Sequence, residues 1–104
     1  MNNCKLKREK DFNKVFKSGK RAFSDSITLY YIEADMMKVG FAVSKKHGKS
    51  VVRNRIKRLL RESFRTFDLS DKNYYFVLVP KVKTEYSFFN FKKDLGYLFK
   101  KIKV

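Results

Sequence analysis

The side chains of this sequence best suited to chemistry are the basic ones of residues 51–67. At about 100° per residue, a helix over this segment gathers Val52, Ile56, Leu59, Leu60 and Phe67 within an arc of roughly 120°, and most of the basic residues fall outside it. Guanidinium groups bind phosphate oxygens in pairs, and ammonium groups add flexible point charge. The segment therefore predicts a helix with one packing side and one phosphate-binding side. The polar and basic residues concerned are Arg53, Asn54, Arg55, Lys57, Arg58, Arg61 and Arg65.

Residue types that perform catalysis are sparse and scattered. His47 is the only histidine and lies in a lysine-rich loop without a neighbouring carboxylate, so we expect an exposed loop residue or a phosphate contact. Cys4 is the only cysteine, and one cysteine forms neither an internal disulfide nor a structural zinc site by itself. The acidic residues show no tight cluster of the kind that holds two catalytic metals. The sequence favours binding, and we expect no catalytic residue and no metal site in this chain.

Composition indicates a folded domain with a polyanionic partner. The chain has 104 residues, which we interpret as a single domain over residues 1–104, and a formal net charge of +16. Its 43% hydrophobic and 16% aromatic content exceeds that of a disordered basic tail. No apolar run is long enough to cross a membrane, and the first residues do not resemble a secretion signal. We expect a cytoplasmic protein that has no membrane contact and binds nucleic acid.

Two elements precede the basic segment with clear patterns. Residues 8–17 predict a short helix that ends near Gly19, with Phe12, Val15 and Phe16 on one side. Residues 27–32 are rich in β-branched and aromatic types and predict a strand that contains Tyr30. Exposed aromatic rings beside a cationic surface stack on unpaired bases, and Phe12 and Phe16 are candidates for that role. Packing of the helix on the sheet is the alternative for both rings.

Residues 38–44 alternate strictly and predict a second strand. Val39, Phe41 and Val43 share one side, which we expect to face the core. The opposite side carries only small residues, which leaves room for either a packed helix or an extended ligand; these residues are Gly40, Ala42 and Ser44. A basic loop follows, with Lys45, Lys46 and Lys49, and Ser50 is a candidate N-cap for the helix after it.

The remaining chain predicts one buried strand and one amphipathic helix. Residues 74–79 are almost continuously apolar, as in a strand covered on both sides, and Pro80 ends the run. Residues 88–102 predict a helix with an apolar side and a lysine-rich side. The fold class is therefore α+β: a helix, two or three strands, the basic helix, a strand and a last helix, with a small mixed sheet and a crossover through the basic helix.

One segment goes beyond composition. Ser44-Lys45-Lys46 leads through Gly48 into Arg53-Asn54-Arg55, and this arrangement closely resembles the signature of the protein subunit of bacterial ribonuclease P. Asp11-Phe12 followed by Val15-Phe16 and Gly19 is similar to the first helix of that family. The resemblance covers roughly residues 6–100.

The resemblance implies an α+β fold with about four strands and three helices in the order α-β-β-β-α-β-α. The crossover through the basic helix is left-handed in that family. The resemblance also implies a holoenzyme that removes the 5′ leader of precursor tRNA, with the catalytic centre and its Mg²⁺ in the RNA subunit, and no required protein partner. Carried over by position, Arg53, Asn54, Arg55, Lys57, Arg58 and Arg61 face RNA; Phe12, Phe16 and Tyr30 line a cleft for the leader; and Lys45, Lys46 and Lys49 form its basic rim. The small residues Gly40, Ala42 and Ser44 then suit an extended RNA strand.

The sequence departs from the family in one place. Many relatives carry an Ala-Arg pair at the end of the strand after the long helix, whereas residues 77–81 here read Val-Leu-Val-Pro-Lys. Whether Lys81 replaces that arginine is left open. The alternative function at this stage is another basic RNA-binding protein, such as a small ribosomal protein, and an independent nuclease is a third hypothesis.

Overall fold

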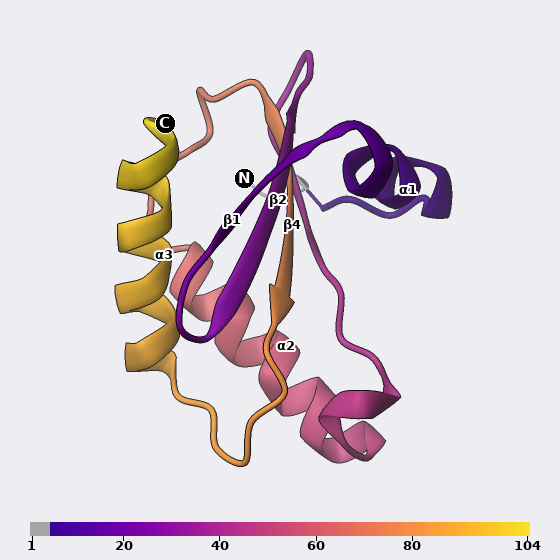
Figure 1. Ribbon diagram of the computed structural model, residues 1–104, viewed down its shortest axis with the longest axis vertical. Coiled ribbons are helices and arrows are strands. Elements are labelled where there is room, and N and C mark those ends of the chain that lie inside the picture. Colours follow the sequence, from indigo (N-terminus) through magenta and orange to yellow (C-terminus); the bar gives the residue numbers. More distant parts are fainter. Residues whose placement is uncertain (1–4) are drawn as a thin grey trace.

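The computed structural model describes residues 5–104 and shows a four-stranded sheet with helices on both sides (Figure 1). Cys4 lies outside the described residues. The element order confirms the predicted α-β-β-β-α-β-α arrangement. The elements are α1 (Glu9–Ser18), β1 (Lys20–Phe23), β2 (Ile27–Glu33), β3 (Lys38–Phe41), a 3₁₀ turn η1 (Lys45–His47), α2 (Ser50–Phe64), β4 (Tyr74–Pro80) and α3 (Phe88–Ile102).

The predicted buried strand occupies the interior of the sheet. The strands lie in the order β1-β2-β4-β3, so β4 pairs on both edges, antiparallel with β2 and parallel with β3. Phe76, Val77 and Leu78 of β4 are fully buried although they alternate between the two faces. An apolar run without alternation is what a strand covered on both faces requires.

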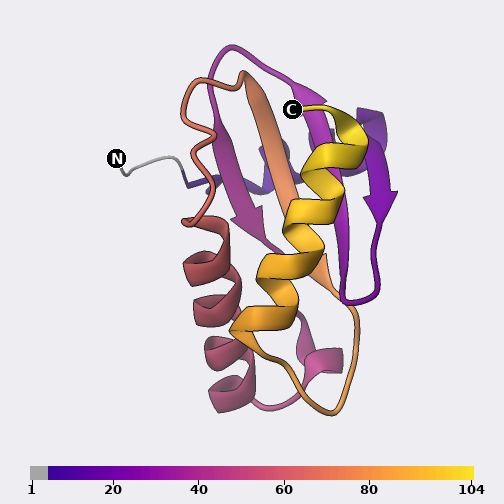
Figure 2. The same cartoon turned by 90° about the vertical axis from the view of Figure 1, so that its left-hand side faces the viewer.

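The crossover between the two parallel strands has the uncommon hand. In Figure 2, β3 and β4 both run downwards, β4 lies to the right of β3, and α2 connects them on the near side of the sheet. This connection is left-handed, whereas nearly all such crossovers are right-handed. The crossover is therefore left-handed, as the resemblance implied.

The two faces of the sheet are covered by helices to different extents. One face packs on both long helices, where Leu29, Phe76 and Leu78 join the apolar sides of α2 and α3 in the main core. The other face carries only α1, whose Val15 packs with Val77 and Leu6 in a smaller cluster. Figure 1 shows α1 and α3 on opposite sides of the sheet, and α2 packs on the same face as α3. The short α1 leaves part of its face uncovered.

Several boundaries differ from the predicted ones. β3 ends at Phe41 because the Ser44 hydroxyl accepts a hydrogen bond from the Lys46 N–H at 3.3 Å and begins η1 there. Ser50 is the first residue of α2, whose N-cap is Lys49, so the prediction that Ser50 caps the helix was wrong. Phe67 lies beyond the end of α2 but still packs edge-to-face on Phe99, with ring centroids 5.2 Å apart. None of the helices in residues 5–104 has the length and apolar character needed to cross a bilayer.

Candidate nucleic-acid interface

The sheet face that α1 leaves open forms a groove. α1 has ten residues and packs near one end of β2 and β4, and the uncovered end holds a hollow of about 530 Å³. We call this hollow the α1 groove. Its lining comes from α1, β2, the segment after β3 and the end of β4: Phe16, Thr28, Tyr30, Ala42, Val43, Ser44, Lys46, His47, Val79, Pro80, Lys81 and Val82.

An aromatic pair marks the end of the groove nearest α1. The Phe16 ring meets the Tyr30 ring edge-to-face, with centroids 4.8 Å apart. Phe16 remains 39% exposed, although a large apolar ring normally gains free energy from deeper burial. An aromatic ring held at an open surface offers its face to an unpaired base, where stacking is worth about 1–3 kcal/mol.

Phe12 and Gly40 contact each other and do not line the α1 groove as predicted. A Cβ atom added to Gly40 would lie 2.4 Å from the Cζ atom of Phe12 and 3.2 Å from the Cβ of Leu6. The Phe12 ring therefore occupies the space above Gly40 and fixes α1 to the sheet. Neither residue lines the α1 groove, because the space predicted for RNA at Gly40 is filled by this contact.

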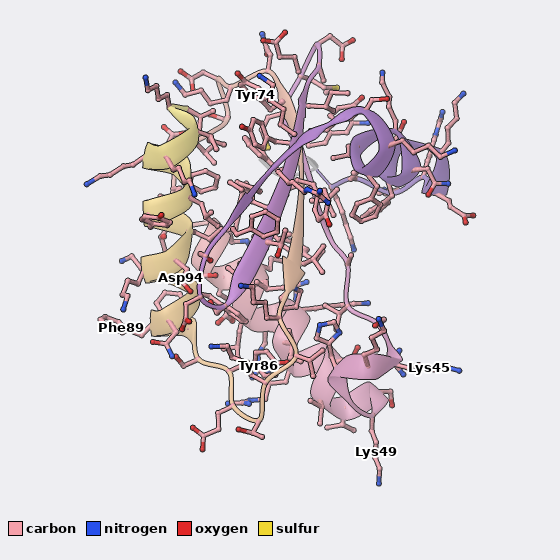
Figure 3. The ribbon with its side chains drawn as sticks, in the orientation of Figure 1. Lys45, Lys49, Tyr74, Tyr86, Phe89 and Asp94 are labelled. Atoms are coloured by element: carbon pink, nitrogen blue, oxygen red, sulfur yellow. The ribbon has the colours of Figure 1, made fainter. Side chains whose placement is uncertain are left out.

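The rest of the small-residue stripe stays open and ends among lysines. Ala42 and Ser44 line the α1 groove, and Lys46 and Lys81 stand at the same end of it. Lys81, whose role the sequence left open, thus lines the groove beside Lys46. None of the lining residues is acidic. Lys45 and Lys49 are exposed near the start of α2 and extend away from the fold (Figure 3), outside the groove lining.

His47 corrects a second prediction. It is buried, not exposed: its Nε2–H donates to the Pro80 carbonyl at 2.7 Å, and its Nδ1 accepts from the Ser44 N–H at 3.1 Å. The Ser44 N–H donor and the Pro80 carbonyl acceptor match the tautomer that carries its proton on Nε2. The imidazole joins the loop after β3 to the end of β4, so it helps to position Lys46 and Lys81.

The predicted cationic side of α2 is present in the structure. Asn54, Arg55, Lys57, Arg58, Arg61 and Arg65 are exposed, with Arg65 at the C-cap, whereas Arg53 is half-buried and its Nε–H donates to the Gly48 carbonyl at 3.1 Å. Lys83–Asp25 is the only ion pair within residues 5–104. The basic side of α2 therefore has no acidic partner in its own fold and is available to phosphates.

These features support binding more than catalysis. Within the described part of the chain no three His, Cys, Asp or Glu side chains come together in a way that could hold a metal ion. What the surface offers is an aromatic groove with a basic end, next to a cationic helix. Sequence reasoning missed several residues of the groove lining: Thr28, Val43, Val79, Pro80 and Val82. The alternation that placed Tyr30 also places Thr28 on the same face, so that residue could have been found.

Comparisons with known proteins show which family the chain belongs to. The sequence model of the Ribonuclease P family matches residues 1–103. The chain belongs to the ribonuclease P protein family. The ribonuclease P protein component of Caldanaerobacter subterraneus is 41% identical over 101 residues, which cover 93% of this chain and 87% of that protein. A Thermoanaerobacter pseudethanolicus component is 47% identical over 70 residues, and there the match spans 65% of this chain and only 60% of the relative.

Solved structures give the same result for the fold. The ribonuclease P protein from Thermotoga maritima is 28% identical and superimposes with a TM-score of 0.81, covering 93% of this chain and 96% of that one. RNA binding and tRNA processing are the functions of the ribonuclease P protein family, whose members are components of an endoribonuclease. Membership in this family also leaves no support for the alternative that the chain is a small ribosomal protein, because only its basic composition had suggested that.

Proposed function

We propose that this ribonuclease P protein binds the catalytic RNA subunit through the exposed basic side of α2 and holds the 5′ leader of precursor tRNA in the α1 groove. The observation that supports the leader site most directly is the groove itself, whose exposed Phe16–Tyr30 pair and basic end occur together without an acidic residue. Stacking on aromatic rings needs the open face of a base, which unpaired nucleotides offer and a duplex does not.

The parallel pairing of β3 and β4 supports a leader site next to the site for the RNA subunit. Parallel strands end at the same edge of a sheet, so Lys46 after β3 and Lys81 after β4 gather there, and α2 starts four residues after Lys46. A leader that leaves the aromatic pair meets these lysines before it reaches the α2 surface. In this proposal the protein holds the leader next to the bound catalytic RNA.

Catalysis is then the task of the RNA subunit. Mg²⁺ is expected at the active site of that RNA, where it would polarise the phosphate and activate water. The protein contributes charge that lowers repulsion between two RNA molecules, together with contacts that hold the leader in place. We expect it to do so in the cytoplasm and without a further protein.

Reconstitution tests this proposal. The protein, a ribonuclease P RNA, and both together are incubated with leader-bearing tRNA in Mg²⁺ at low salt. We expect no cleavage by the protein alone and faster leader removal by the complex than by the RNA alone. Leader removal by the protein alone would instead support an independent nuclease. An RNA whose cleavage is unchanged by stoichiometric protein would contradict the proposed subunit role.

A further inference from the structure

A second hollow lies on the other side of the molecule. It has a volume of about 560 Å³ and lies between α3 and the segment after α2. Its side chains are three aromatic rings and three lysines: Phe67, Phe89, Tyr97, Lys92, Lys93 and Lys100. We call it the α3 surface. Figure 1 shows α3 and α1 on opposite sides of the sheet, so occupation of the α1 groove leaves the α3 surface free.

Two of the rings are unusually exposed for their size. Phe89 is 70% exposed and Tyr97 is 54% exposed. Figure 3 shows Phe89 pointing away from the molecule. The two rings are eight residues apart on one helix, which is about 12 Å along the axis, so they can serve two different bases. Neither ring contributes much to the core, and removal of either should leave the fold intact.

The charge of the α3 surface is uniformly positive. None of its lining residues is acidic, and Lys101 adds a further ammonium 5.7 Å from the Tyr97 ring centroid. Asp94, the only acidic residue of α3, is buried and accepts hydrogen bonds from the Ser26 N–H at 2.9 Å and from the Ser26 hydroxyl. It is therefore turned away from this surface, in the direction of the β1–β2 turn (Figure 3).

Gly96 keeps the floor of this hollow open. A Cβ at this position would lie 3.7 Å from the Phe67 ring, which is ordinary contact, so alanine fits there. Glycine inside a helix costs about 1 kcal/mol relative to alanine. Packing does not require the glycine, and its effect is to leave the Phe67 ring uncovered between Lys92 and Lys100.

We propose that the α3 surface is a second binding site for single-stranded RNA, separate from the α1 groove. Interleaved rings and lysines without acidic neighbours are the combination that binds unpaired nucleotides, since the lysines contact phosphates and the rings stack on bases. A second copy of the chain would bring lysines against lysines, and an apolar protein partner would leave them unpaired. The charge therefore favours a strand of RNA over either protein occupant.

The test follows backbone amide signals of the full ¹⁵N-labelled chain during titration with an octauridylate. We expect two groups of shifts, one around Ala42 and Ser44 in the α1 groove and one around Gly96 and Tyr97. The double variant Phe89→Ala/Tyr97→Ala should raise the Kd of the second group at least fivefold and leave the first group unchanged. Met36→Ala is the matched control, because Met36 is a 46% exposed apolar side chain outside both surfaces.

A second double variant distinguishes weaker RNA binding from loss of the fold. Lys92→Gln/Lys100→Gln keeps the rings and should also weaken the second group selectively, with a smaller dependence on salt. Absence of octauridylate-induced shifts at Gly96 and Tyr97 would overturn the proposal. It would also be overturned if inorganic polyphosphate or an RNA duplex competed as well as the single strand, because the rings would then have no role. Neither result bears on the α1 groove, whose signals are read separately.

Discussion

Phe12 and Phe16 are one helical turn apart on α1, but the Phe12 ring packs on the sheet whereas the Phe16 ring is exposed in the α1 groove. Phe16→Ala removes an exposed ring that meets Tyr30 at 4.8 Å. The lost edge-to-face contact is worth about 0.5–1.5 kcal/mol of folding stability. The lost base stacking is worth about 1–3 kcal/mol, which raises the Kd for a leader-bearing tRNA about five- to 150-fold.

Phe12→Ala is the matched control for this substitution. The Phe12 ring fills the space above Gly40 and fixes α1, so its removal leaves a cavity and should lower the free energy of unfolding by about 3 kcal/mol. For a domain of this size that corresponds to a fall in Tm of at least about 10 °C. Phe16→Ala should therefore mainly change the Kd for leader-bearing tRNA, whereas Phe12→Ala should mainly change the Tm.

The assay measures both quantities for both variants. Tm is obtained by thermal denaturation of the free protein. The Kd values for leader-bearing and leaderless tRNA are obtained with the protein reconstituted on ribonuclease P RNA, at a temperature where each variant is folded. We expect Phe16→Ala to weaken only the leader-bearing tRNA. Equal weakening of both tRNAs, or a fall in Tm as large as that of Phe12→Ala, would refute the assignment of Phe16 to the α1 groove.

Three further substitutions test other parts of the structure. Arg58→Ala removes one exposed cation of α2 and should lower the salt dependence of RNA-subunit binding by about 0.7–0.9 in log–log slope; an unchanged slope would show that α2 does not face the RNA. Asp94→Ala leaves the buried N–H and hydroxyl of Ser26 without an acceptor and should lower the free energy of unfolding by about 1–3 kcal/mol in urea; an unchanged midpoint would contradict this reasoning. Gly40→Ala places a Cβ 2.4 Å from the Phe12 ring and should destabilise the fold by about 1–3 kcal/mol, which a Tm equal to that of the unsubstituted protein would exclude.

Elements with a strong periodic pattern could be predicted from the sequence. The helix expected over residues 88–102 coincides with α3, because its apolar and lysine-bearing positions separate cleanly on the helix surface. β1 had no such signal: it has four residues, of which only Ala22 is buried. A strand this short at the edge of a sheet depends on its partner β2 more than on its own sequence.

The candidate site was predictable in part for a related reason. The cationic side of α2 follows from local spacing alone, and it appears in the structure as expected. The errors at His47 and Gly40 concern contacts between distant segments, His47 with Pro80 and Gly40 with Phe12. A local pattern shows that a residue is small or polar, but it does not show which segment will cover it. Tertiary packing decided which rings stayed exposed.

The parallel pairing of β3 with β4 has a mechanical consequence. The α1 groove and the first turn of α2 are separated by a short loop, which the Ser44 cap and the hydrogen bond from His47 to Pro80 hold in place. The distance between the two surfaces is thus a property of the sheet and not of a flexible linker. If two RNA segments bind to these surfaces at once, the fold keeps them at a fixed distance from each other. We expect a longer loop to change the separation of the two surfaces.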